Sequence, residues 1–448
     1  MKKIFFIIII SFLVFSCNSD NGSIDPKPNP ETKKPLAADD DFDLVEDNEL
    51  ILSNLLSNDE KGDNAKINTI ETTGSKGGTI VDNRNGTYTY TPPSGYVGTD
   101  TFKYTICDNH TPKNCSTATV TIKITDEGSP LAVDDSYNAA KNTARTLIGI
   151  LENDNLTDDA VITSVDNTST EGVATLNTDG SVSYAPKNNF VGDDKFTYTV
   201  CDDDSPTQTC TTATVTITIL ESIAFNIPSE LASYYATMAL VDDADLSYSL
   251  LKEFTTQKHT TILSYGQRHN FLYNADEDNA NTDNVILMYS GESRYWEEYT
   301  SNANSYNPQT FNTEHIYPQS RLSTNNAVTD LHHLRSCDAS VNSQRSNFPF
   351  VSGSGTYKLE GDKWYPGDEW RGDVARMIMY LNVRYGETFD KVGTLELFLE
   401  WNKADPVSDF EIQRNTIIEA AQGNRNPFID NPYIATLIWG GVAAENKW

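Results

Sequence analysis

Two copies of one strand-rich pattern constrain this chain more than any other feature. The segment YVGTDTFKY at residues 96–104 returns about 94 residues later as FVGDDKFTY at 190–198. In both copies threonine alternates with valine, isoleucine and tyrosine, which is typical of antiparallel strands with one face in a core and one in solvent. The pattern predicts two all-β sandwiches of about seven strands each, at residues 36–126 and 130–220.

These copies resemble tandem bacterial Ig-like, or cadherin-like, domains. Each copy holds two cysteines that flank a short polar hairpin turn. We expect Cys107 to pair with Cys115 and Cys201 with Cys210, because an exported protein folds in an oxidising setting. Cys337 is then left as a buried free thiol.

The N-terminus predicts export. Two lysines precede an apolar run at residues 4–15, which is too short for a permanent membrane span and indicates a signal peptide over residues 1–17. The run ends in a segment that resembles a lipoprotein cleavage box, so Cys17 is the expected site of lipidation. Residues 18–35 are rich in Asn, Asp, Pro and Ser and predict a flexible tether. We expect an outer-membrane lipoprotein facing the periplasm or the cell surface, or a secreted protein, whose contact with the membrane is through this anchor alone.

The alternating pattern stops near residues 221–228, and residues 229–448 predict a third domain of α+β class that is mostly helical. Apolar residues recur at helical spacing from Val374 to Tyr385, followed by Gly386 as a helix end. Ser408 and Glu411 are spaced as a capping box that begins another helix, which Gly423 ends. A short strand is expected at 285–289, and two strands and a helix between 312 and 347.

Three polar segments in that last stretch contain the residues best suited to catalysis. They read NTEHIYP at 312–318, DLHHL at 330–334 and VNSQRSN at 341–347. Glu314 and Asn342 offer oxygen ligands that suit a hydrated Mg²⁺, since two protein ligands leave most of its coordination shell to water and phosphate. His315 beside them is a general base whose ordinary pKa lies near neutrality. The combination suits phosphodiester hydrolysis.

In this order the segments resemble the bacterial endonuclease I family, whose members carry a ββα-metal, or His-Me finger, active site. The similarity runs over residues 231–439 and includes RGDVAR at 371–376 and QGNRNPF at 422–428. The resemblance implies that His315 is the general base and that Glu314 and Asn342 bind one divalent cation, Mg²⁺ with Ca²⁺ or Mn²⁺ as alternatives. It implies products with 5′-phosphates, and a backbone carbonyl at Val328 that orients His315.

The resemblance also implies an arginine that grips the cleaved phosphate, and Arg321 is the only arginine between the first two segments. Arg345 is a candidate for substrate binding, with a helix-surface position or a structural ion pair as the alternative. His332 and His333 do not form a zinc site, because such a site needs about four Cys or His ligands and only Cys337 lies nearby. We expect these two histidines to pack or to form hydrogen bonds.

Charge opposes tight binding of nucleic acid. The formal net charge is −31, whereas nucleic-acid binding usually relies on a basic surface. We therefore expect an exported, metal-dependent endonuclease that binds DNA, RNA or both weakly and with little sequence specificity; no protein partner is evident. The alternative is a surface adhesin or glycan-binding protein with an inactive nuclease-like domain. In either case the acidic runs at 39–41 and 134–135 are candidates for Ca²⁺ binding in the Ig-like repeats.

Overall fold

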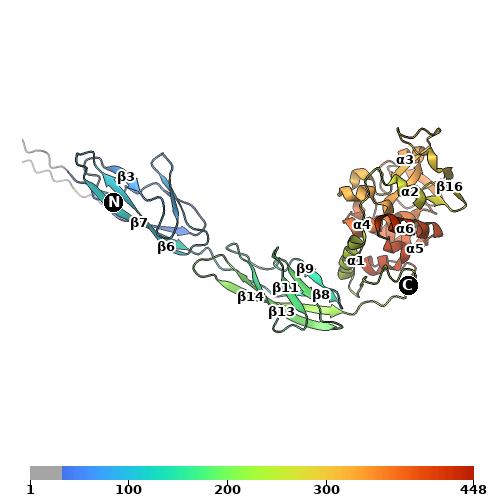
Figure 1. Ribbon diagram of the computed structural model, residues 1–448, viewed down its shortest axis with the longest axis horizontal. Helices are drawn as coiled ribbons and strands as arrows, with labels where there is room; N and C mark the ends of the chain where they lie inside the picture. The colour runs from blue at the N-terminus through green and yellow to red at the C-terminus, as the bar shows by residue number, and fades with distance from the viewer. Residues whose placement is uncertain (1–32) are drawn as a thin grey trace, which may run out of the picture. The chain divides into compact units, whose positions relative to one another are not determined.

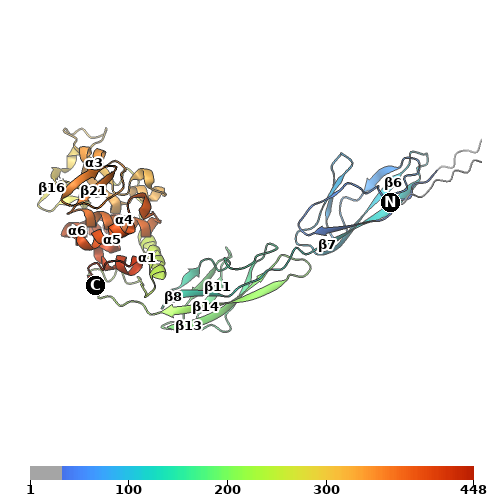
Figure 2. The ribbon, with the colours of Figure 1, turned by 180° about the vertical axis from the view of Figure 1, so that it is seen from behind.

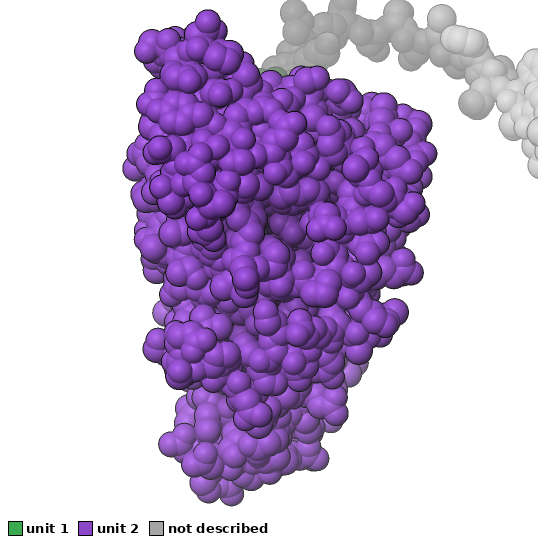
Figure 3. Space-filling model, turned by 90° about the vertical axis from the view of Figure 1, so that its right-hand side faces the viewer, with its two compact units in different colours: residues 1–130, 156–160, 201–210 green, residues 131–155, 161–200, 211–448 purple. Residues whose placement is uncertain are grey.

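The computed structural model describes residues 33–448 (Figures 1 and 2). These residues divide into two compact units. Unit 1 comprises the residues up to 130 together with 156–160 and 201–210. Unit 2 comprises 131–155, 161–200 and 211–448, and Figure 3 draws it in space-filling form. The predicted signal peptide and Cys17 lie outside the described residues. From residue 33 to the last residue, no helix combines the length and the apolar character needed to cross a membrane.

The first repeat folds into two sheets, in the strand orders β1-β7-β6-β3 and β2-β5-β4. β1 runs parallel to β7, and the other pairs are antiparallel. Buried and more exposed residues alternate along β7, as the threonine pattern predicted, and Val120 and Ile122 lie in the core. The strands are β1 (Asp40–Val45), β2 (Leu50–Leu52), β3 (Lys66–Ile70), β4 (Thr79–Asp82), β5 (Tyr88–Thr91), β6 (Gly98–Cys107) and β7 (Cys115–Thr125).

The second repeat has the same arrangement, with sheets β10-β13-β14-β8 and β11-β12-β9. Both predicted disulfides are confirmed: Cys107 bonds to Cys115 and Cys201 to Cys210, in each case across the turn between the two longest strands of a repeat. The strands are β8 (Asp135–Ala140), β9 (Arg145–Leu147), β10 (Val161–Asp166), β11 (Val173–Leu176), β12 (Val182–Ala185), β13 (Gly192–Cys201) and β14 (Cys210–Leu220).

The C-terminal domain contains both helices and small sheets. Its helices are α1 (Ala244–Lys258), α2 (His269–Ala275), α3 (Ala339–Arg345), α4 (Arg371–Tyr385), α5 (Leu395–Ala404), α6 (Asp409–Gln422), α7 (Pro427–Asp430) and α8 (Tyr433–Trp439). Its strands are β15 (Glu277–Asp278), β16 (Asn281–Ile286), β17 (Ser293–Tyr295), β18 (Phe311–His315), β19 (Leu334–Asp338), β20 (Thr356–Glu360) and β21 (Lys363–Gly367). The side chains of α4 lie in its largest core, so this helix is the centre of the scaffold.

The predicted helix ends are confirmed. α4 ends at Gly386 and α6 at Gly423, both with left-handed φ angles of 75° and 88° that glycine adopts without strain. The capping box of Ser408 and Glu411 begins α6. The strand expected at 285–289 was placed too late: β16 ends at Ile286, because the chain turns at Tyr289, whose φ of 69° is incompatible with a strand.

Candidate active site

A β-hairpin and the helix after it bring the three candidate residues together. β18 pairs with β19 in antiparallel register, and α3 follows β19 directly. Asp338 caps α3, because its carboxylate accepts two backbone N–H groups of the first turn at 2.9 and 3.1 Å. Asn342 lies in that first turn, so its side chain reaches back to β18, which ends in Glu314 and His315.

Glu314 is a buried carboxylate held by two side chains. It is 3% exposed. Its Oε1 accepts a hydrogen bond from the Tyr289 hydroxyl at 2.9 Å and lies 3.4 Å from Nε of Arg345. Burial raises the pKa of Glu314 to about 7, although Arg345 and Tyr289 act in the opposite direction. A second positive charge at this carboxylate would favour its ionised form.

Asn342 is oriented by hydrogen bonds of its amide nitrogen. Nδ2 donates to Oδ1 of Asn312 at 2.7 Å and to the carbonyl oxygen of Thr313 at 3.2 Å. Since both partners are acceptors, the nitrogen of the amide is assigned and the oxygen is the atom left for a ligand. An amide oxygen is the group that a hard cation requires.

His315 has its tautomer set by the backbone. Its Nε2 lies 3.1 Å from the carbonyl oxygen of Val328, the contact expected from the family resemblance. Nε2 must donate in this contact, so Nδ1 is the nitrogen with a free lone pair. Burial, followed by the neighbouring His333 and Arg268, lowers the pKa of His315 to about 3, against the opposing effect of the Val328 contact. The imidazole is therefore neutral at ordinary pH, as a proton acceptor must be.

Glu314, His315 and Asn342 line one open pocket of about 380 Å³, together with residues 318–320 and 346–347. One carboxylate and one amide oxygen on the same pocket suit a divalent cation that keeps several of its waters. Although Arg345 lies beside it, burial keeps the pKa of this carboxylate raised, and a divalent cation would favour its ionised form. The residues present therefore fit the cation that the family resemblance implies.

The structure places the two candidate arginines in different surroundings. Arg345 was a candidate for substrate binding, with a helix-surface position or a structural ion pair as the alternative, and it is fully buried and donates to the carbonyl oxygens of Ile316 and Phe348. Its positive charge lies beside the Glu314 carboxylate. The structure therefore favours the structural ion pair over substrate contact for Arg345. Arg321 donates to the carbonyl of Lys391 and is absent from the lining of the pocket, and its phosphate-gripping role stays a prediction.

The neighbouring histidines are structural. His332 is bonded through Nε2 to the carbonyl of Asn424 at 3.2 Å, and His333 to that of Ala327 at 2.7 Å. Both are buried, and neither belongs to a group of potential metal ligands among the residues that the structure describes. Cys337 is a free, buried thiol.

Comparison with known proteins identifies the domain. The Endonuclease I family model matches residues 246–433, after a bacterial cadherin-like domain at 32–126 and a bacterial Ig domain at 127–218. An extracellular ribonuclease of Bacillus subtilis (strain 168) is 42% identical over 205 residues, which is 40% of this chain and 69% of the relative. The chain belongs to the endonuclease I family.

Other relatives of this endonuclease I domain are named as ribonucleases or as deoxyribonucleases. The extracellular ribonuclease of Bacillus amyloliquefaciens is also 42% identical over 205 residues and is covered to 69%. An extracellular deoxyribonuclease of Aeromonas hydrophila is 30% identical over 112 residues, covering 22% of this chain and 49% of the relative. The family thus includes proteins named for either nucleic acid.

Three residues that contact or influence the candidate site carry no signal in the sequence. Tyr289 holds Glu314, and Arg268 acts on the pKa of His315. Asp276, fully buried, accepts the backbone N–H of Ser336 at 2.6 Å and so positions β19. All three lie far upstream of the motifs, and only the fold brings them to the hairpin.

Acidic residues also cluster in unit 1, but not the predicted ones. Glu46, Asp126, Asp158 and Asp204 have carboxylate oxygens that all lie within 4.8 Å of one another, and three of the four are buried. Burial raises the pKa of Glu46 to about 8, with Asp158 and Asp204 adding to the effect. The acidic runs singled out from the sequence are not part of this cluster; within them, Asp39 and Asp134 accept the N–H groups of Thr119 and Thr214 at 2.7 Å, and their binding of Ca²⁺ stays a prediction.

Proposed function

We propose that the C-terminal domain is a metal-dependent endonuclease that hydrolyses phosphodiester bonds of DNA, RNA or both with little sequence specificity. The observation that carries the proposal is the shared pocket of Glu314, His315 and Asn342, in which His315 has a free Nδ1. In this proposal Nδ1 takes a proton from the water that attacks the phosphorus. The bond between phosphorus and the 3′ oxygen breaks, the 3′ oxygen takes a proton from solvent water and leaves as a hydroxyl, and the phosphate stays on the 5′ oxygen of the downstream fragment.

The cation has a limited part in this proposal. Bound between Glu314 and Asn342, a divalent ion would stabilise negative charge on the cleaved phosphate and on the departing 3′ oxygen. The protein groups around it keep their own tasks: Arg345 and Tyr289 hold the carboxylate, and Asn312 holds the amide. Mg²⁺ is the proposed ion because an open site with two oxygen ligands suits its habit of keeping water.

The test is cleavage of plasmid DNA and of RNA by the full chain with Mg²⁺ or with EDTA. We expect cleavage with Mg²⁺ only, and a loss of at least about 100-fold in His315→Ala, the usual effect of removing a general base. His110→Ala is the matched control, because this histidine belongs to the first repeat and does not line the pocket. The products should accept a 5′ label from a kinase only after phosphatase treatment.

Absence of cleavage with any divalent cation would instead favour the alternative, an adhesin or glycan-binding protein with an inactive domain. Export is part of the proposal as well, either as an outer-membrane lipoprotein anchored through Cys17 or as a secreted protein. Incorporation of radiolabelled lipid, abolished in Cys17→Ala, is the expected result for the anchored form.

We also propose that the acidic cluster of unit 1 binds Ca²⁺. Oxygens of Glu46, Asp158 and Asp204 are buried without a hydrogen-bond partner, which is costly unless a cation neutralises them. Calorimetric titration of the full chain with Ca²⁺ should detect a site that Glu46→Gln weakens at least about tenfold. Asp43→Asn, an exposed carboxylate of the same domain, should leave it unchanged. Equal binding by both variants would refute this site.

A further inference from the structure

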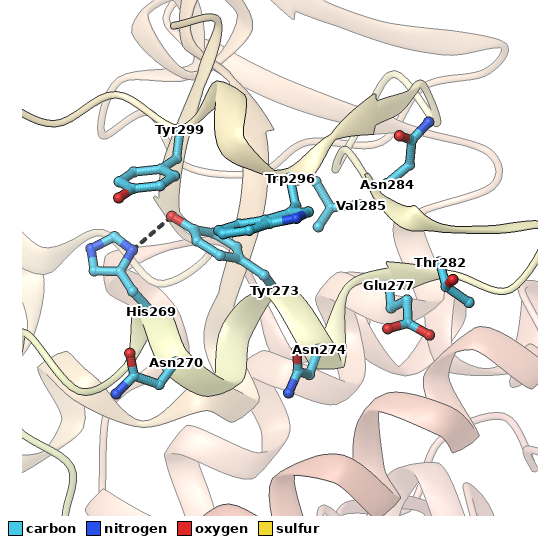
Figure 4. Close-up of a pocket in the computed structure, with 10 residues that line it drawn as sticks. All are labelled: His269, Asn270, Tyr273, Asn274, Glu277, Thr282, Asn284, Val285, Trp296 and Tyr299. Carbon is cyan, nitrogen blue, oxygen red and sulfur yellow. Dashed lines mark hydrogen bonds between the residues drawn. The ribbon is translucent and has the colours of Figure 1, made fainter. Parts of the chain in front are cut away.

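A second pocket of the nuclease domain, of about 410 Å³, is lined by aromatic rings (Figure 4). His269 and Tyr273 come from α2, Trp296 from the short helical turn Trp296–Glu298, and Tyr299 from the residue after it. The ring centroid of Tyr273 lies 5.5 Å from that of Tyr299 and 6.3 Å from that of Trp296. The proposed catalysis uses none of these residues.

Trp296 is the most exposed of these rings. It remains 40% exposed, whereas Tyr273 is largely buried beneath it and is held by a 2.7 Å hydrogen bond to Nδ1 of His269. The pocket therefore holds an aromatic cluster in which Trp296 keeps part of its surface open to solvent. A large apolar ring left at the surface beside a pocket is suited to stacking with a flat ligand.

The polar groups of this pocket suit a neutral ligand better than a phosphate. None of the residues that line it within the described chain is lysine or arginine, and burial lowers the pKa of His269 to about 4, so that its ring is neutral. The lining instead offers the side chains of Asn270, Asn274, Asn284 and Glu277. Amides both donate and accept hydrogen bonds, and a carboxylate accepts from amino groups, which matches the edge of a nucleobase.

The pocket is connected to the active site by β18. Phe311 begins this strand and packs edge-on against Tyr273, with centroids 5.7 Å apart, while His315 ends it. Four residues of extended strand span about 13 Å. About four stacked nucleotides at about 3.4 Å each, or fewer in a stretched strand, have the length of β18.

We propose that this aromatic pocket binds an unpaired nucleobase of the strand being cleaved, and so gives the enzyme a preference for single-stranded RNA or DNA over duplex. The inference rests on the proposed nuclease function. In a duplex the bases are paired and stacked on one another, so their faces are not available to Trp296. In a single strand a base can leave the stack and lie on the ring while its sugar-phosphate backbone continues towards His315.

The experiment measures binding without cleavage. The full chain with His315→Ala is titrated with Mg²⁺ present against a single strand of about eight nucleotides that contains 2-aminopurine, whose fluorescence falls when it stacks. Quenching is expected for DNA and RNA strands and for the free 2-aminopurine nucleotide, and not for a duplex. Adding Trp296→Ala should weaken single-strand binding by about 5- to 150-fold, and Trp296→Phe should restore most of it.

Tyr433→Ala is the control, because this partly exposed ring of α8 lines neither pocket. Equal affinity with and without Trp296, or displacement of the probe by a neutral oligosaccharide, would overturn the base pocket. Failure of the nuclease proposal is distinguishable, since binding is measured on a variant that is not required to cleave. Cleavage of duplex and single strands at equal rates by the unmodified chain would overturn the preference while leaving the nuclease intact.

Discussion

At the scale of single residues, the ionisation of Glu314 controls the candidate metal site. Its pKa of about 7 in the folded chain, against an ordinary 4.5, means that a bound proton must leave before the carboxylate can bind a cation. Without a cation, the folded state holds this proton more tightly than the unfolded state. The resulting stabilisation is present below about pH 4.5 and is lost as the pH rises through about 7.

This ionisation predicts how metal binding depends on pH. Below about pH 7 the affinity for Mg²⁺ should fall about tenfold per pH unit, and binding should release up to one proton. Calorimetry in buffers of different ionisation enthalpy measures both quantities. Glu314→Gln should bind Mg²⁺ at least about tenfold more weakly and release no proton. Because the pKa of His315 is only about 3, loss of activity between pH 7 and 5 belongs to Glu314, and an identical acid limb in a Glu314 variant would contradict this assignment.

At the scale of elements, the helix ends show why local patterns predicted parts of this domain. Ser408 and Glu411 exchange hydrogen bonds at the start of α6, with the Glu411 N–H to Ser408 Oγ distance at 3.2 Å. These bonds depend only on residues three apart, so the sequence contains all the information they need. The hairpin of β18 and β19 is different, because β19 donates a backbone hydrogen bond to Asp276, which follows α2 and is distant in sequence.

The capping box predicts a measurable contribution to stability. Ser408→Ala removes the hydroxyl that accepts the backbone N–H of Glu411. This loss should lower the free energy of unfolding of the nuclease domain by about 0.5–2 kcal/mol. All six tryptophans lie at residue 296 or beyond, so their fluorescence in denaturant reports on this domain alone. Thr416→Ala, at an exposed position of the same helix, is the control and should change the midpoint far less. Equal midpoints for the two variants would show that the cap is dispensable.

At the scale of the whole molecule, the net charge of −31 limits binding to phosphate backbones. No lysine or arginine of the described chain lines the aromatic pocket. Arg345 is buried in an ion pair with Glu314 and is not available to a phosphate. We expect the His315→Ala chain to bind duplex DNA with a dissociation constant in the micromolar range or weaker at physiological salt, as in non-specific complexes. Fluorescence anisotropy over a salt series measures this, and a nanomolar value at physiological salt would contradict it.

The sequence by itself determined the strands of both repeats, their disulfides, the helix ends of α4 and α6, and the hairpin-helix motif with Glu314, His315 and Asn342. These features depend on alternation, on short spacings or on one contiguous motif, and such signals survive without knowledge of the fold. Only the tertiary structure decided that Arg345 is buried beside Glu314. It also decided that Tyr289 bonds to Glu314 and that Arg268 lies near His315. The clustering of Glu46 with Asp158 and Asp204 is a third such result. Those residues come from separate segments of the chain. Their charges interact only at distances of a few ångströms, and the spacing of residues in the sequence does not show which segments come that close.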